Sequence, residues 1–322
     1  FQSWPYLAHI IFTGGTTDGM NRIVHIINDV VCGDSIKNKT IMVSDLDHHS
    51  ARLPFEVLWD SHGCNIVLCP LNAENNLDYL NMPRADIFVI TAMSNVLGIP
   101  QNVSRIIAAA REKNPNVITI VDAAQYVAHE KIDVQKWDCD FMCFSAHKIG
   151  GDTGLGIMYM KNPNRWVSPD KFGGGMIAKV KGSAADHSYE LQWEPAPAKF
   201  EAGTLPLTQI SGLVPAIDYL ERNRPDKKLL QYLYDELVKM PRIKILTSRE
   251  SALLTFTVED MHPLDFGALA GSHGICLRVG NMCASWIHAR LGIPGSIRIS
   301  TGPWNTMDDM KRTAEIIRDI VK

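Results

Sequence analysis

The chain has 322 residues, of which 46% are hydrophobic and 21% are charged, and its formal net charge is −3. A chain of this length suits one large α/β unit with a smaller domain beside it. The near balance of charges argues against a general nucleic-acid or membrane-binding surface, and no apolar run approaches the ~20 residues of a membrane span. We therefore expect a soluble protein that binds neither nucleic acid nor membrane.

The seven cysteines are scattered along the chain. An odd, dispersed set argues against a disulfide framework and is typical of a reducing compartment. No group of cysteines and histidines has zinc-finger spacing, so we expect no metal site. The first residues also lack the charged and apolar regions of a signal peptide. These features predict a cytoplasmic protein, with an organelle as the alternative location.

The first half of the chain alternates short apolar, β-rich runs with helical patterns, such as the helix predicted over residues 103–112. Continuous apolar strands separated by helices indicate an α/β fold with a mostly parallel sheet that is covered on both faces. The predicted strands span residues 40–43, 65–68, 87–90, 117–121, 141–144 and 156–160.

The second half of the chain shows a different pattern of predicted helices and strands. Residues 163–205 are rich in Gly, Pro and Trp and show little periodicity, which predicts a long loop region of a kind that is uncommon unless functional. The elements predicted after it are helices over 207–222, 226–239, 262–272 and 306–321 and strands over 253–258, 275–279 and 296–300. We expect a large domain at residues 1–222 and a small α+β C-terminal domain at residues 223–322.

Asp122 stands at the end of a strongly apolar predicted strand. An unpaired charge is costly in such a place. Ligands of open α/β sheets bind at the carboxyl ends of strands, so Asp122 is a candidate site residue. The alternative interpretation is a helix N-cap, which aspartate often provides.

Lys148 follows another apolar strand, close to Ser145 and His147. A lysine in this place could bind a carbonyl ligand covalently as a Schiff base. The ordinary alternative is a solvated lysine on a loop.

A Gly14-Gly15-Thr16-Thr17 turn precedes an apolar helix predicted over residues 20–27. Backbone N–H groups and hydroxyls converge there at the positive end of a helix, which makes a phosphate cradle. A threonine N-cap is a compatible alternative, and the lysine of a Walker loop is absent. A phosphate site, a carboxylate and a lysine are the three groups that pyridoxal 5'-phosphate (PLP) requires: an anchor, a partner for the pyridine nitrogen and a covalent attachment.

The motifs resemble the cysteine desulfurase and selenocysteine lyase family, and most closely its SufS-like group within the class-V aminotransferases. Two blocks are Val121-Asp122-Ala123-Ala124-Gln125 and Phe144-Ser145-Ala146-His147-Lys148. The other blocks, in chain order, are residues 12–17, 47–50, 94–98, 132–135, 139–141, 200–204 and 278–284. The resemblance implies the type I fold of PLP-dependent transferases.

The resemblance also implies roles around the cofactor ring. Lys148 would carry PLP, Asp122 would pair with the pyridine nitrogen, and Gln125 would bond the ring hydroxyl. His48 would stack on the ring face and help to move protons. A polar histidine at a helix start is the alternative interpretation of His48.

Further implied roles concern the phosphate and the substrate. Thr204 would reach the phosphate bound by the partner subunit of a homodimer, unless it only caps the helix at residue 207. Asn95 would lie near the ring hydroxyl and the substrate. Arg298, together with Arg278, would bind the substrate, with Arg298 gripping its carboxylate as a bidentate fork; a surface ion pair is the alternative for Arg298. The phosphate of the same subunit would be held by Thr16, Thr17, Ser145 and His147.

Cys283 is implied to accept sulfur from L-cysteine, which leaves as L-alanine while a persulfide forms on the thiol. The persulfide would supply iron–sulfur cluster assembly or a related pathway, through a possible sulfur-acceptor protein. The alternatives are a selenocysteine lyase acting on L-selenocysteine, another class-V aminotransferase or lyase, and a catalytically reduced scaffold. By itself Cys283 could equally be an inert core residue.

The chain departs from the family pattern in three places. The family carries a further segment before the phosphate loop, it has two histidines where this chain has Asn281-Met282, and its segment corresponding to residues 222–260 is longer. We expect these departures to bear on activity more than on fold.

Overall fold

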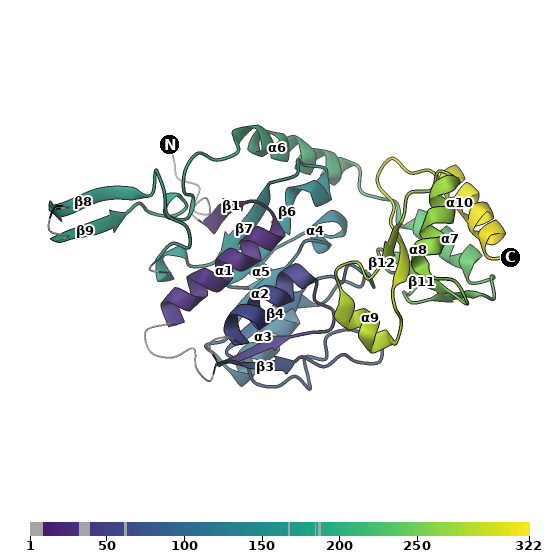
Figure 1. The fold of residues 1–322 in the computed structure, drawn as a ribbon, viewed down its shortest axis with the longest axis horizontal. Helices are drawn as coiled ribbons and strands as arrows, with labels where there is room; N and C mark the ends of the chain where they lie inside the picture. The colour runs from purple at the N-terminus through teal and green to yellow at the C-terminus, as the bar shows by residue number, and fades with distance from the viewer. Residues whose placement is uncertain (1–8, 32–38, 61–62, 167, 184, 186–187) are drawn as a thin grey trace.

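The computed structural model describes residues 9–31, 39–60, 63–166, 168–183, 185 and 188–322. Its larger sheet has seven strands in the order β1-β7-β6-β5-β4-β2-β3 (Figure 1). Strands β6, β5, β4, β2 and β3 run parallel to one another, while β7 is antiparallel to both β6 and β1. The prediction of a mostly parallel sheet is therefore confirmed. The strands are β1 (Ile10–Thr13), β2 (Thr40–Val43), β3 (Asn65–Leu68), β4 (Ile87–Thr91), β5 (Ile118–Asp122), β6 (Phe141–Ser145) and β7 (Gly156–Met160).

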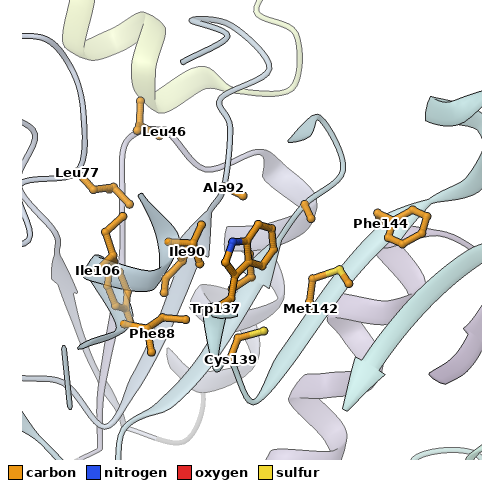
Figure 2. Close-up of a cluster of buried hydrophobic side chains, with 14 of the residues drawn as sticks. Leu46, Leu77, Phe88, Ile90, Ala92, Ile106, Trp137, Cys139, Met142 and Phe144 are labelled. Atoms are coloured by element: carbon orange, nitrogen blue, oxygen red, sulfur yellow. The ribbon is translucent and has the colours of Figure 1, made fainter. Parts of the chain in front are cut away.

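Two apolar clusters cover the two faces of this sheet. Residues of α1 and α2, such as Ile23 and Phe55, pack on one face, and residues of α3, α5 and α6, such as Ile106 and Trp137, pack on the other. Figure 2 shows part of the second cluster. All residues of β4, β5, β6 and β7 are buried, which explains why these strands read as continuous apolar runs. The helices are α1 (Thr16–Val31), α2 (His49–Asp60), α3 (Val103–Lys113), α4 (Tyr126–His129), α5 (Val134–Trp137) and α6 (Leu207–Arg222).

A second, antiparallel sheet has the order β10-β11-β13-β12 and packs against α7, α8 and α10 through its own apolar cluster. The α+β character predicted for the C-terminal part is thus confirmed, while the boundary between residues 222 and 223 stays a prediction. The elements are α7 (Lys227–Leu237), β10 (Ile243–Ile245), β11 (Leu254–Val258), α8 (Pro263–Ser272), β12 (Arg278–Gly280), α9 (Ser285–Leu291), β13 (Ser296–Ile299) and α10 (Met307–Ile320).

The interpretation of residues 163–205 as loop was wrong in part. Strands β8 (Ile177–Ser183) and β9 (Ser188–Trp193) pair as a separate two-stranded sheet that projects from the body (Figure 1). Every residue of β8 is exposed, so no buried face imposes the alternation of apolar and polar residues by which a strand is recognised.

Two helix and strand starts differ clearly from the predictions, and one strand was not predicted. Helix α1 begins at Thr16 instead of residue 20, since its first turn is polar and lacks an apolar periodicity. Strand β12 begins at Arg278 instead of residue 275, and β1 was not predicted. No helix among the residues described is long and apolar enough to cross a membrane.

Candidate active site

A pocket of about 240 Å³ lies where β4, β5 and β6 end. Every candidate cofactor or substrate residue named above contributes to its lining, except Cys283 and Thr204. The lining residues are Thr16, Thr17, His48, Ser50, Thr91, Met93, Asn95, Asp122, Ala124, Gln125, Ser145, His147, Lys148, Arg278, Met282 and Arg298. A larger pocket of about 790 Å³ shares four of them: Gln125, His147, Lys148 and Arg298.

The start of α1 is fixed against the end of β6. The Thr16 N–H donates to Ser145 Oγ at 2.8 Å, and the hydroxyls of the two residues are also 2.8 Å apart. A Cβ at Gly156 on β7 would lie 2.5 Å from Gly15 Cα, so only glycine allows this close approach. The turn therefore gathers hydroxyls and helix N–H groups at one end of the pocket, an arrangement suited to a phosphate.

Asp122 does not cap a helix, so that alternative was wrong. Helix α4 begins at Tyr126, and the Asp122 carboxylate instead accepts the Ala124 N–H at 2.9 Å. Burial raises the pKa of Asp122 to about 6, although the Ala124 N–H and the charge of Lys148 lower it. The fold thus holds a buried carboxyl group in the pocket without a salt-bridge partner among the described residues.

Lys148 lies in a short 3-10 helix, Ala146–Ile149, directly after β6. Part of its side chain is exposed in the pocket, yet desolvation lowers its pKa, and the charges of Arg298 and Arg278 lower it further while Asp122 opposes them. A lysine in such surroundings is more easily deprotonated, and hence more nucleophilic, than a solvated surface lysine.

Three buried polar atoms that face no hydrogen-bond partner among the described residues belong to residues of this pocket. They are Gln125 Oε1, Asn95 Oδ1 and Arg298 Nε. Buried polar groups are rarely left unsatisfied, because each such group carries a desolvation penalty. Their grouping around one cavity indicates a site built to bind a polar ligand.

Arg278 and Arg298 stand directly opposite each other on the antiparallel strands β12 and β13. Like charges in this register repel. Burial and the charge of Arg278 lower the pKa of Arg298, whose Nη1 donates to the Asn95 carbonyl oxygen at 2.7 Å. Arg298 forms no ion pair within the described residues, so the surface ion-pair interpretation was wrong, and the pair is suited to bind an anion.

His48 lies at a helix start and also lines the pocket, so its stacking on the cofactor ring stays a prediction. Its Nδ1 accepts the Ser50 N–H at 3.1 Å at the start of α2, and it also lines the pocket. Burial and the neighbouring His49 lower the pKa of His48 to about 4, so the ring is neutral at pH 7. Asp47 holds this turn, because its carboxylate accepts hydrogen bonds from Thr91 at 2.6 Å and Ser44 at 2.7 Å.

Cys283 lies beside the pocket and does not line it. Its neighbour Met282 does, and Asn95 Nδ2 donates to the Met282 carbonyl oxygen at 2.8 Å. Cys283 is half-buried, so it is no core residue. Cys143 in β6 and Cys139, which precedes that strand, are fully buried, and burial raises the pKa of Cys139 to about 12. Among the residues described, no cluster of His, Cys, Asp or Glu could hold a metal ion.

Thr204 is exposed and lies outside the pocket of its own chain. It does not cap α6, whose N-cap position is Pro206, so that alternative was wrong.

His129 was missed by sequence reasoning. Its Nε2 lies 3.0 Å from Gln125 Nε2, and burial lowers its pKa to about 4. The available signal was the i,i+4 spacing of the two residues.

The chain is similar to known proteins over most of its length. Residues 4–313 match the class-V aminotransferase family. A cysteine desulfurase of Serratia proteamaculans is 31% identical, with 97% of this chain and 78% of the relative covered. One of Cronobacter sakazakii is 33% identical, with 96% and 77% covered.

Solved structures of similar fold include two cysteine desulfurases. The cysteine desulfurase CsdA of Escherichia coli matches with a TM-score of 0.86 at 30% identity, over 97% of this chain and 78% of that one. The cysteine desulfurase of Thermococcus onnurineus matches with a TM-score of 0.88 at 26% identity, over 98% and 79%. The type I PLP-dependent transferase fold is therefore confirmed, while the narrower SufS-like group stays a prediction. This chain belongs to the class-V aminotransferase family, whose members use pyridoxal phosphate.

Proposed function

We propose that this protein is a cysteine desulfurase that converts L-cysteine to L-alanine and collects the sulfur as a persulfide on Cys283. The observation that carries the proposal is a single pocket lined by Lys148, Asp122 and the facing arginines Arg278 and Arg298. The loop that holds Cys283 lies beside this pocket. The relatives named as cysteine desulfurases support the same activity. We further propose that the sulfur passes to an acceptor protein for iron–sulfur cluster assembly or a related pathway in the cytoplasm.

The pocket fits PLP, because it offers three orphaned polar atoms, a hydroxyl cradle and a buried carboxyl group. Lys148 would hold the carbonyl carbon, Asp122 the pyridine nitrogen and Gln125 the ring hydroxyl, with His48 against the ring face. Thr16, Thr17, Ser145 and His147 would hold the phosphate. When bound, the cofactor supplies an electron sink for the carbanion formed at the substrate Cα.

The side chains of the protein would perform the remaining tasks. Arg298, with Arg278 and Asn95, binds the substrate carboxylate and orients the Cα–H bond toward Lys148. Lys148 Nζ, once free of the cofactor, removes the α proton. The Cys283 thiolate then attacks the substrate sulfur: an S–S bond forms, the substrate C–S bond breaks, and protonation of the carbon product yields alanine.

Replacing Cys283 by serine should separate binding from sulfur transfer. We expect the Cys283→Ser variant to keep its cofactor and to show the spectral change caused by added L-cysteine, while persulfide and alanine formation are lost, because a hydroxyl is a far weaker nucleophile than a thiolate. Cys276→Ser is the matched control, since Cys276 is also accessible, and it should behave as wild type. Persulfide mapped by mass spectrometry to Cys276 or Cys139 in the wild type would show that another thiol accepts the sulfur. Comparing the rates of alanine formation from L-selenocysteine and from L-cysteine tests the selenocysteine lyase alternative.

We also propose a homodimer in which Thr204 completes the phosphate site of the partner. Three observations support it: Thr204 is exposed, it lies outside its own pocket, and it follows Gly203, whose φ of 82° permits a sharp turn. Glu201 anchors the same loop beside the phosphate turn by accepting the Phe12 N–H at 2.8 Å.

Mixing two inactive variants tests the shared site. In a dimer of Lys148→Ala with Thr204→Glu, one site carries both changes and the other carries neither. Reassorted mixtures should therefore recover activity in up to about a quarter of their sites. No recovery in mixtures that contain mixed dimers, or a monomer by light scattering that binds PLP firmly, would contradict the shared site.

A further inference from the structure

We propose that His49 is a positioning residue that holds the loop of Cys283 in place by capping the helix that follows it. The inference rests on the proposed function, because it takes Cys283 as the acceptor thiol. Its structural basis is a reciprocal contact between the starts of α2 and α9.

The first N–H groups of a helix have no partner within the helix. At the start of α2, the His49 N–H donates to the carbonyl oxygen of Cys283 at 2.8 Å. At the start of α9, the Ser285 N–H donates to His49 Nε2 at 3.2 Å, and the N-cap residue Ala284 supplies no side-chain bond of its own. The Cys283 carbonyl oxygen thus accepts an N–H at the start of α2, and His49 Nε2 accepts an N–H at the start of α9. His49 and Ser285 are 236 residues apart in the sequence.

The imidazole is also linked to Cys283 through side chains. His49 Nε2 lies 3.1 Å from Ser285 Oγ, and Asn281 Nδ2 donates to the same hydroxyl at 3.3 Å. Asn281 Oδ1 in turn accepts the Cys283 N–H at 3.1 Å. Because Nε2 accepts the Ser285 N–H, His49 acts as the neutral tautomer with its proton on Nδ1. Burial lowers the pKa of His49, which favours this neutral form.

The loop needs such support because its backbone is strained. Met282 and Cys283 are consecutive non-glycine residues with φ values of 53° and 54°, in the left-handed region. Side chains rarely adopt this region, and such residues persist only where their surroundings fix them. A loop released from the bonds of His49 would leave this conformation, and the thiol would move with it.

Packing keeps the two helices together independently of the imidazole nitrogens. The Trp286 ring meets His49 edge-on, with ring centroids 5.2 Å apart, and the Arg52 guanidinium lies 4.1 Å from the Trp286 centroid. Asp45 lies 3.6 Å from both Arg52 and Arg290. A ring without a hydrogen-bond acceptor would preserve this packing and remove only the cap.

Two substitutions separate the cap from the packing. His49→Phe keeps a ring against Trp286 but has no acceptor, and His49→Gln keeps an acceptor within reach of the Ser285 N–H. One measurement is the rate at which iodoacetamide alkylates Cys283, mapped by mass spectrometry with Cys276 as an internal reference. The others are the rate of persulfide formation on L-cysteine and the visible spectrum of the bound cofactor. His25→Phe, on an exposed position of α1, is the matched control.

We expect His49→Phe to speed alkylation of Cys283 and to slow persulfide formation, each by about tenfold, since loss of a helix cap shifts a local equilibrium by about this factor. The cofactor spectrum should not change, and His49→Gln should restore most of both rates. Unchanged rates in His49→Phe, or equal losses in the Phe and Gln variants, would overturn the proposal. If the wild type forms no persulfide on Cys283, the proposed function fails, and the alkylation rates alone decide whether His49 holds the loop.

Discussion

Replacing Lys148 by alanine is expected to remove the visible absorbance of the purified protein and to abolish turnover. Lys148 is proposed both to bind the cofactor covalently and to move the α proton. Loss of proton transfer by a positioned side chain alone costs about 10²–10⁴-fold in rate, and loss of the covalent attachment adds to it. The measurements are the absorption spectrum and the rate of alanine formation from L-cysteine.

A second lysine at a strand end provides the control. Lys161 follows β7, outside the pocket, and forms an ion pair with Asp138 at 2.5 Å. Lys161→Ala should keep both the spectrum and the activity. A Lys148→Ala protein with an unchanged visible spectrum would contradict the assignment of the cofactor lysine.

Replacing Asp122 by asparagine is expected to lower turnover by roughly 10²–10⁴-fold while PLP still binds. The amide can still accept the Ala124 N–H, which Asp122 accepts at 2.9 Å, but it has no charge to stabilise a protonated pyridine nitrogen. The electron sink is then weaker. Steady-state rates of alanine formation, compared at equal cofactor occupancy, test this expectation, and a rate close to wild type would contradict the proposed role.

Although Asp122→Asn should lower turnover, it should raise the free energy of unfolding of the cofactor-free protein. The folded-state pKa of Asp122 is raised from 3.8 to about 6, so the folded protein holds this proton more tightly than the unfolded chain does. The resulting contribution to stability is fully present below pH 4 and is lost as the pH rises through about 6. At pH 8, Asp122→Asn should therefore raise the free energy of unfolding by at most roughly 3 kcal/mol, and at pH 4 by much less. Equal effects at both pH values in denaturant titrations would argue against the raised pKa.

The large sheet could be predicted from the sequence because its strands are buried on both faces. The runs of β4 and β6 are apolar up to their last residues, Thr91 and Ser145, and they are too short for most helices. The β8–β9 hairpin could not be predicted in this way, because β8 is exposed along its whole length. Helix α1 was detected only from its apolar part, and its start at Thr16 became evident from the bonds to Ser145.

In the candidate site too, local sequence patterns revealed some residues, while the positions of others depend on tertiary contacts. Asp122 and Lys148 could be found because Asp122 ends one apolar strand and Lys148 lies in the turn after another, and parallel strands end at one edge of the sheet. The positions of Asn95 and Arg298 depend on how the two sheets meet, so they were inferred only through the family resemblance. The contact between His49 and Ser285 joins residues too far apart in sequence for any local pattern to reveal it.

The most direct test of this account is to fix the cofactor chemically and locate it. Treating the protein with borohydride after saturation with PLP, digesting it and mapping the peptides by mass spectrometry will show which lysine carries the pyridoxyl group. We expect the group on Lys148 in wild type, and on no lysine in Lys148→Ala. A pyridoxyl group on another lysine, or its absence from a protein that has been saturated with PLP, would contradict the central claim that this pocket is a PLP site built around Lys148.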